Sequence, residues 1–439
     1  MKKIFLFLSI FLLLFLSLEA VEKISLEQAV KNGLKISGSY KNRFLSEKEA
    51  ALRVEQSLKD RLFSLDLKAY YLYKSDTMTI EFPGVDIPGM TSMPGQSFEA
   101  GLYHNYDLSV SLSQPLFNGG VLSRRVEMEK VREAVEANQT ELQRDSLVDT
   151  IKSSFYDYQI LISQKKAVLS LRKVLELHSQ KLSDLYTEGL VKKTDLLETK
   201  SRLEEADMNI NDLNQALDKV SIDFHRLCGH YPEEIEPVHK EAEQSEEQAL
   251  DYFENHHPVL KTMQDQKKVL ELQKKIVSGK YFPSINGFAE LHYGKPGIDY
   301  FAKEWSLYFQ GGVVLNMPVF DWNKGAREKD VIDVTIRKLE NQRDDFVMDI
   351  TKSLQQLYSV KRSLNKKKAN IENMIAYSKE DAALKRALYE EKQIPNVDYL
   401  AALQSEKKYE SMKRELMLQI EKINVKINTL ISRTKEYGS

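Results

Sequence analysis

A long helical pattern that occurs twice constrains this chain more than any other feature. No proline stands between Asn118 and about Cys228, and apolar residues recur there three and four positions apart, as on one face of a coiled-coil helix. The same pattern returns 203 residues later, where Ile350 matches Leu147. Such helices bury their apolar stripes only against a partner, so the pattern predicts long helical hairpins that pack side by side.

The repeat extends beyond the helical pattern itself. Pro115 matches Pro318 and Phe117 matches Phe320 at the same offset of 203 residues. A register kept for about a hundred residues through proline, aromatic and acidic positions indicates a chain built from two repeats. Further matches fall near the predicted turns and on the returning arms: Tyr186 with Tyr389, Asp195 with Asp398, and Leu213 with Leu416.

The first residues predict export from the cytoplasm. Lys2 and Lys3 precede an apolar run that reaches Leu18, and Ala20 supplies the small residue of a cleavage site. The run of roughly 15 residues is shorter than the ~20 that a spanning helix needs. We therefore predict a signal peptide at residues 1–20. The formal net charge of −2 argues against a nucleic-acid partner.

Each predicted repeat contains a helix, a pair of strands and a long helical hairpin. Between the repeats, proline and many glutamates predict an acidic linker or equatorial segment. The predicted boundaries are residues 21–228 for repeat 1, with strands in 60–117 and the hairpin in 118–228; 229–250 for the linker; and 251–439 for repeat 2, with strands in 281–320 and the hairpin in 321–435.

The predicted strands alternate apolar and polar residues. Leu65 and Leu67, for example, alternate with Asp66 and Lys68. Period-two alternation over about ten residues, with aromatic residues near the ends, is typical of transmembrane barrel strands, although a half-buried soluble hairpin gives the same pattern. Four strands per chain are too few for a barrel, whose smallest single-chain form has about eight. Closure therefore requires several copies, and three copies give twelve strands.

Helix lengths define the predicted fold class. The stretch from Asn118 to Gly189, where the chain turns back, spans roughly 105 Å, and the returning arm of about 40 residues spans roughly 60 Å. A helix from Ser25 to about Leu58, opened by a capping box, supplies the missing length. We predict a mainly α fold, a two-repeat protomer of long coiled-coil helices plus four β-strands. A second turn is predicted at Pro395.

At this point the chain resembles the TolC-type outer-membrane efflux proteins, or outer membrane factors. The resemblance rests on five motifs, taken in their order: residues 26–29, the strand-to-helix junction 114–120, the turn 189–197, the strand start 281–285, and the echo of the junction at 317–321. It implies a homotrimer in the outer membrane of a Gram-negative bacterium, with a twelve-stranded barrel among the lipids and a twelve-helix periplasmic tunnel. Its tip docks on a periplasmic adaptor (membrane fusion) protein and an inner-membrane transporter.

The resemblance also implies functional residues. Asp398 falls on the family position whose acid forms a ring of carboxylates at the constriction. Alternatively, Asp398 is only an acid that favours a helix N-terminus. Tyr389 hydrogen-bonds Asp195 across the tips, or it only packs in the helical seam. The predicted periplasmic gate is Asp398, Asp195, Thr194 and Tyr389, and the predicted adaptor-docking tip is Gly189, Leu190, Val191, Lys392 and Pro395.

Three positions depart from the family pattern. Ala401 stands where the family has its second ring acid, Ile394 where it has a latch arginine, and Lys392 where it has the glycine of the second turn. The first strand also lacks the usual proline near Phe63. These departures imply a gate with fewer charged contacts than the family pattern.

The predicted function is a passive conduit, the exit duct of a tripartite efflux or type I secretion system. We predict no enzymatic activity and no cofactor, because no nucleophile and base occur in a convincing arrangement. His225, Cys228 and His230 are three candidate metal ligands without a fourth, so we predict no metal site. The alternative is a non-channel periplasmic coiled-coil scaffold or tether whose strands form a soluble cap. The transported substrate is not encoded in any motif.

The first prediction concerns Asp398. Asp398→Ala is expected to change single-channel conductance or cation selectivity in planar bilayers, because threefold symmetry would bring three carboxylates together. The change should be larger at low salt, since 0.1 M salt screens exposed charges beyond about 10 Å. An unchanged current at both low and high salt would remove Asp398 from the constriction.

Overall fold

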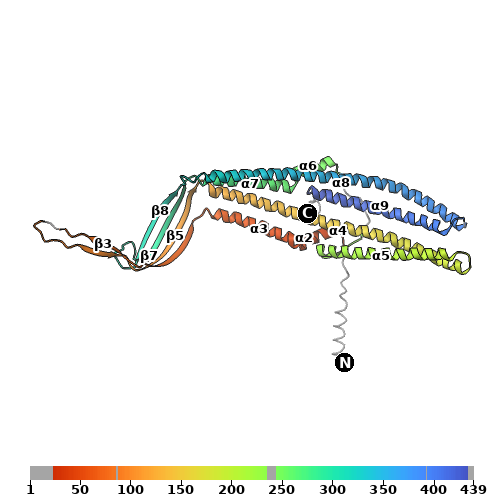
Figure 1. Cartoon of the computed structure of the whole chain (residues 1–439), viewed down its shortest axis with the longest axis horizontal. Coiled ribbons are helices and arrows are strands. Elements are labelled where there is room, and N and C mark those ends of the chain that lie inside the picture. Colours follow the sequence, from red (N-terminus) through yellow and green to blue (C-terminus); the bar gives the residue numbers. More distant parts are fainter. Residues whose placement is uncertain (1–22, 86–87, 235–243, 392, 434–439) are drawn as a thin grey trace, which may run out of the picture. The chain divides into compact units, whose positions relative to one another are not determined.

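The computed structural model describes residues 23–85, 88–234, 244–391 and 393–433. The predicted signal peptide, Lys392, much of the predicted linker and the last residues of the predicted second hairpin lie outside the described residues. The described chain is mainly helical, as predicted (Figure 1). Among its helices, none is both long and apolar enough to cross a membrane. The helices are α2 (Leu26–Ile36), α3 (Gly38–Lys59), α4 (Val121–Thr187), α5 (Lys193–Cys228), α6 (Glu246–His256), α7 (Pro258–Gly279), α8 (Lys324–Glu390) and α9 (Asn396–Leu430).

The elements recur at two offsets. Helix α4 begins at Val121 and α8 at Lys324, 203 residues later, and each has 67 residues. Helix α3 begins at Gly38 and α7 at Pro258, 220 residues later, and each has 22 residues. The difference of 17 residues falls between the two strands of the first pair, where the chain adds a second hairpin, β3 (Met78–Phe82) and β4 (Gln96–Ala100).

The helix predicted from Ser25 to about Leu58 is wrong as a single element. The capping box is present, since Ser25 accepts from the Gln28 backbone N–H, but α2 ends at Ile36 and α3 begins at Gly38. The hydroxyl of Ser37 accepts a hydrogen bond from the Tyr40 backbone N–H (3.3 Å), which starts a new helix. A second capping box at Ser245 opens α6, which begins inside the predicted linker segment 229–250 and continues past its end.

The described residues form two compact units. Unit 1 combines Ala137–Thr262 with the described parts of Met1–Ser46 and Gln342–Ser439, and it contains the ends of the long hairpins. Unit 2 combines Glu47–Glu136 with Met263–Asn341, and it contains the sheets apart from a two-residue parallel pair, β1 (Lys23–Ile24) and β6 (Tyr231–Pro232), in unit 1.

A four-stranded antiparallel sheet in the order β2-β5-β7-β8 forms the centre of unit 2. Its strands are β2 (Ser64–Tyr73), β5 (His104–Asn118), β7 (Ser284–Lys295) and β8 (Ser306–Asn316). The register places mainly polar residues on one face of the sheet and apolar residues on the other, as period-two alternation predicts. One row across the sheet is Lys68, Ser109, His292 and Tyr308, and the next is Leu67, Val110, Leu291 and Phe309.

Unit 1 contains a separate apolar core for each helical hairpin. In the first, Phe155 of α4 packs on Phe224 of α5 with ring centroids 5.9 Å apart, beneath α2. In the second, Leu354 of α8 packs with Ile427 and with Phe253 of α6. Each core joins one long helix, its returning arm and one short helix.

The contacts between the two hairpins are partly ionic. Lys422 of α9 donates to both carboxylate oxygens of Asp157 on α4 (2.6 and 2.8 Å). Asp149 of α4 lies among Lys152, Lys422 and Lys426, and it accepts from the Thr429 hydroxyl. Burial raises the pKa of Asp149, while these neighbours oppose that rise. Ionic groups therefore join two cores that are apolar inside.

A second prediction concerns the first core. Phe155→Ala is expected to cost roughly 3–5 kcal/mol, because Phe155 is fully buried and its removal leaves a cavity. Thermal unfolding in detergent followed by circular dichroism measures this loss. Leu169→Ala, an exposed position on the same helix, is the matched control. An equal effect of the two substitutions would contradict the assignment of Phe155 to the core.

Candidate functional site at the hairpin ends

The turn from α4 to α5 is closed by a glycine. Gly189 has φ +72°, its N–H donates to the Tyr186 carbonyl (3.0 Å), and the Leu190 N–H donates to the Leu185 carbonyl (2.9 Å). This bond pair is the Schellman motif. A Cβ at Gly189 would meet no atom within 4 Å, so the backbone angle alone favours glycine there. The structure thus places Gly189, Leu190 and Val191 at one turn.

The turn from α8 to α9 closes in a related way. The Gln393 N–H donates to the Leu388 carbonyl (2.9 Å), the counterpart of the bond made by Leu190. Pro395 takes the N-cap position of α9 with extended backbone angles and no side-chain cap. Lys392, the counterpart of Gly189, lies outside the described residues.

The two acids predicted for the gate occupy the first turns of α5 and α9. The Asp195 N–H donates to the Lys192 carbonyl and the Asp398 N–H to the Pro395 carbonyl, both at 3.2 Å. The Thr194 hydroxyl lies 3.5 Å from a carboxylate oxygen of Asp195. Both acids therefore lie where a helix dipole favours negative charge, as expected if they only stabilise helix N-termini. Asp398 is exposed.

Tyr389, on α8, belongs to a cluster of rings from three helices. Its ring stacks on Tyr399 of α9 (centroids 5.1 Å apart, planes 10° apart) and contacts His178 of α4 (5.7 Å). The ammonium of Lys181 lies 5.5 Å from the same ring centroid. Burial raises the pKa of Tyr389, and the charges of Tyr399 and Asp195 add to that rise. Tyr389 thus packs in the seam, with Asp195 close enough to act on it.

His178 is the residue of this cluster that the sequence did not reveal. Its side chain is buried, and its Nε2 has no hydrogen-bond partner among the described residues. Burial lowers the pKa of His178 to about 4, and the positive charge of Lys181 adds to the effect. Its counterpart 203 residues later is Asp381. The repeat therefore gave no signal, because the cluster depends on contacts between helices that are distant in sequence.

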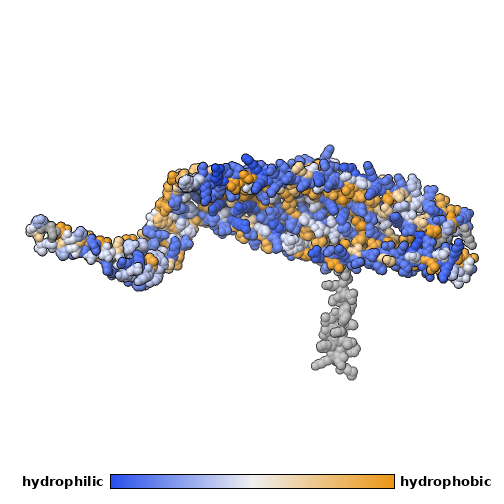
Figure 2. Space-filling view, viewed as in Figure 1, coloured by the Kyte–Doolittle hydropathy of each residue, from blue (hydrophilic) through white to orange (hydrophobic). Residues whose placement is uncertain are grey.

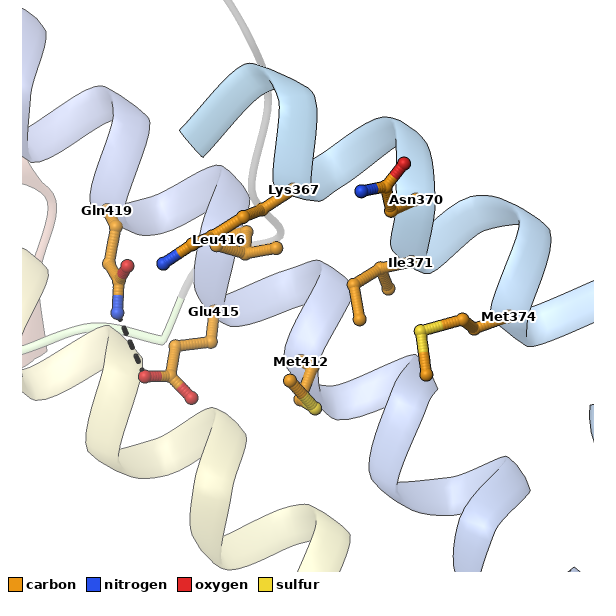
Figure 3. Close-up of a pocket in the computed structure, with 8 residues that line it drawn as sticks. All are labelled: Lys367, Asn370, Ile371, Met374, Met412, Glu415, Leu416 and Gln419. Carbon is orange, nitrogen blue, oxygen red and sulfur yellow. Dashed lines mark hydrogen bonds between the residues drawn. The ribbon is translucent and has the colours of Figure 1, made fainter. Parts of the chain in front are cut away.

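Two grooves run along the hairpins within unit 1. The first, about 710 Å³, lies between α4 and α5 and is bordered by α9. The second, about 370 Å³, lies between α8 and α9 (Figure 3). In the second, Ile371 and Met374 face Met412 and Leu416, while the Gln419 amide donates to Glu415 (2.9 Å) at the rim. Figure 2 shows further apolar side chains at the surface of the helices and of the sheet.

Two of the three candidate metal ligands near the end of α5 have side-chain contacts of other kinds. The Cys228 thiol is buried and donates to the Phe224 carbonyl (3.1 Å), so it belongs to the first core. The His225 ring lies against Tyr231, with centroids 4.9 Å apart. Over residues 23–85, 88–234, 244–391 and 393–433, no group of three or more His, Cys, Asp or Glu side chains is arranged to hold a metal ion.

Comparison with known families identifies part of the chain directly. Residues 50–230 match the family described as outer membrane efflux protein. The resemblance predicted from the sequence motifs is therefore confirmed over that segment, which contains the first strand pair and the whole first helical hairpin. Compared by sequence with individually curated proteins, the chain matches none.

Comparison with solved structures gives the fold of nearly the whole chain. CusC, whose structures were described in relation to folding and transmembrane channel formation, is 13% identical to this chain. The TM-score is 0.73, and the match covers 93% of this chain and 92% of CusC. The outer membrane protein VceC of Vibrio cholerae is 12% identical (TM-score 0.71; 93% and 96% covered). The outer membrane channel CmeC of Campylobacter jejuni is 11% identical (TM-score 0.71; 93% and 85% covered). The chain shares their fold.

A third prediction concerns His178 and pH. The folded protein holds His178 neutral down to pH ~4, whereas an exposed imidazole takes up a proton near 6.5. Stability at the hairpin ends is therefore expected to be full near neutral pH and to fall as pH drops from about 6.5 to 4, by roughly 3 kcal/mol at most. Hydrogen exchange of the peptides around residues 178, 389 and 399 measures this loss.

His178→Phe should flatten that pH dependence, because phenylalanine fills the ring cluster and takes up no proton. His257, a second buried histidine with a pKa lowered to about 4, is the control position. His257→Phe should leave exchange at the hairpin ends unaltered. The same pH slope at the hairpin ends in wild type and His178→Phe would contradict the role given to His178.

Proposed function

We propose that this protein is the outer-membrane exit duct of a tripartite efflux or type I secretion system. It passively conducts substrates from an inner-membrane transporter across the periplasm and the outer membrane, and a gate at the hairpin ends controls passage. The family match at residues 50–230 and the fold shared with outer membrane channels support this proposal. The energy for transport comes from the partner, since a passive duct needs neither a catalytic site nor a cofactor.

One observation carries the proposal: the four-stranded sheet of unit 2 has an exposed apolar face. Leu67 of β2 and Phe309 of β8 expose 71% and 68% of their surface, and Leu65, Leu307, Val313 and Leu315 are similarly exposed. An exposed apolar face of this extent marks a surface that leaves water in the working protein. Acyl chains of the outer membrane are the partner that suits an alternating strand.

The opposite face of the sheet is polar and internally bonded. The His292 ring lies between Asp107 (Nδ1 to Oδ2, 3.0 Å) and Glu290 (Nε2 to Oε2, 3.4 Å). Gln310 donates to the same Glu290 carboxylate (2.6 Å), and Tyr308 stacks on His292. A hydrated lumen is the environment that suits this face, because each polar group keeps partners or water.

Aromatic residues stand at both ends of the apolar face. Tyr106 contacts Tyr71 and Trp305 at one end, with centroids 5.2 and 5.8 Å apart. Phe320 and Trp322, whose rings lie 4.9 Å apart, are exposed at the other. The ten residues of β2 rise about 33 Å, which becomes about 25 Å at a tilt of roughly 40°. This matches the apolar band of outer-membrane barrels, about 25 Å.

Trimerisation follows in this proposal from the sheet edges. Within the described chain, β2 and β8 each pair with one neighbour, so each leaves one edge for another copy. If β8 of one copy pairs with β2 of the next, three copies form a closed barrel of twelve strands. The hairpin ends then surround the periplasmic gate, with Asp398, Asp195, Thr194 and Tyr389, and carry the adaptor-docking turns at Gly189 and Pro395.

The experiment that tests the proposal combines assembly with conductance. Purified protein is expected to migrate as a trimer that heat converts to monomer, to fractionate with outer membranes, and to conduct ions in planar bilayers. A monomeric protein without conductance, released from membranes by salt alone, would overturn the proposal and favour the periplasmic scaffold. Leu67→Asp with Phe309→Asp should abolish insertion, whereas substitutions at exposed helix positions such as Leu169→Ala should not.

A further inference from the structure

The two helical hairpins meet near their ends through an apolar notch beside the ring cluster. Leu400 of α9 enters the notch and is only 4% exposed, because it packs against Leu175 of α4 and Ala206 of α5. His178 stands three residues after Leu175, so both side chains lie on the same face of α4. The face of α4 that carries His178 is therefore the face on which the second hairpin rests.

His178 completes this contact with its ring. The His178 ring centroid lies 5.7 Å from that of Tyr389 on α8 and 6.2 Å from that of Tyr399 on α9. The side chain is only 7% exposed, and its Nε2 has no hydrogen-bond partner among the described residues. A neutral imidazole fills such a site much as an apolar ring would, whereas an imidazolium would bring an uncompensated charge into it.

The surroundings of His178 favour its neutral form. On the same helix, the ammonium of Lys181 repels an imidazolium, and this ammonium already lies 5.5 Å from the Tyr389 ring centroid. The groups that face His178 from α8 and α9 are the phenols of Tyr389 and Tyr399, and Asp195 of α5 acts on Tyr389. Burial is the larger cause, and with Lys181 it lowers the pKa of His178 to about 4. Keeping this contact and taking up a proton are therefore opposed.

The second repeat carries a different arrangement at the matching positions. Asp381 is the counterpart of His178, and it is exposed and paired with Lys385 (3.2 Å). Tyr186, the counterpart of Tyr389, exposes 42% of its surface. The histidine contact therefore belongs to the junction between the two hairpins of one chain, so it acts within a copy rather than between copies.

We infer that protonation of His178 releases the α8–α9 end from α4 within each copy and so opens the gate of the proposed duct. The inference rests on the proposed function, and it names a signal that operates the gate. Above pH 6.5 the imidazole is neutral whether the contact is closed or open, so the closed arrangement keeps its full stability. As pH falls from 6.5 through about 4, only the open arrangement accepts the proton readily, which shifts the balance toward opening by up to roughly 300-fold.

Conductance across this pH range tests the role of His178. In planar bilayers at fixed ionic strength, the open probability of the wild type should rise as pH falls from 6.5 to 4, and His178→Phe should lose most of that rise. Asp195 and Asp398 are present in both proteins, so any effect of theirs cancels in the comparison. His257→Phe is the control, because His257 packs on Phe253 in the second core, and it should keep the wild-type response. The same response in wild type and His178→Phe would overturn the inference.

Disulfide trapping tests the movement itself. In a Cys228→Ala background, which removes the one native thiol, Leu175→Cys with Leu400→Cys joins the two hairpins across the notch. Oxidation should abolish the rise in open probability at low pH, and a reductant should restore it. The matched control is Leu175→Cys with Ala206→Cys, which joins α4 to α5 inside the first hairpin and should leave the rise in place. A rise that persists when the two hairpins are cross-linked would overturn the release of α8–α9 from α4.

The state of the oligomer separates this inference from the proposed function. Because the released contact lies within one chain, the trimer should stay intact in detergent between pH 6.5 and 4. A trimer that dissociates in this range in the wild type but not in His178→Phe would place the histidine contact between copies and overturn the inference. A conducting trimer with no difference between wild type and His178→Phe overturns only this inference. A protein that neither trimerises nor conducts overturns the proposed function itself.

Discussion

The burial of one apolar stripe in each helical hairpin is the interaction on which the other contacts depend. Phe155 and Phe224 are fully buried in one core, and Leu354 and Phe253 in the other. Between the hairpins, Lys422 and Asp157 form an ion pair. Dry, well-packed seams hold each hairpin rigid, whereas the contacts between hairpins combine this partly solvated ion pair with the ring contacts of His178 on Tyr389 and Tyr399. Partly solvated ion pairs contribute little to stability, so in the proposed duct they are the contacts that dilation would break at the lowest cost.

The sheet imposes a second constraint. One face buries polar side chains around His292 and the other exposes leucines and phenylalanines, so a single copy leaves its apolar face in contact with water. Two outer strands also keep free edges within the described chain. In the proposed duct, lipid would cover the apolar face and further copies would pair with the free edges, so insertion and assembly would solve the two problems together.

Sequence periodicity predicted much of this fold. Heptad spacing located the long helices and their turns, and period-two alternation located the four strands of the main sheet. Periodicity did not predict the break between α2 and α3 at Ser37. There a single hydroxyl, which accepts a hydrogen bond from the Tyr40 N–H, ends one helix and starts another although the helical pattern continues. Periodicity also missed β3 and β4, which lie in a segment rich in proline and glycine. At the candidate site it located Gly189 and the acids of the first turns, but not His178, whose role depends on rings from other helices.

Reversed charges at matched positions of the two repeats have a consequence for the proposed duct. Asp149 on α4 lies near Lys426 on α9, whereas the residues 203 positions away from them are Lys352 on α8 and Asp223 on α5. If like halves of two copies met, Asp149 would approach Asp223, or Lys352 would approach Lys426, and this repulsion would disfavour the contact. Contacts between unlike halves would bring an acid and a base together, so four side chains would favour one order of the halves over the others.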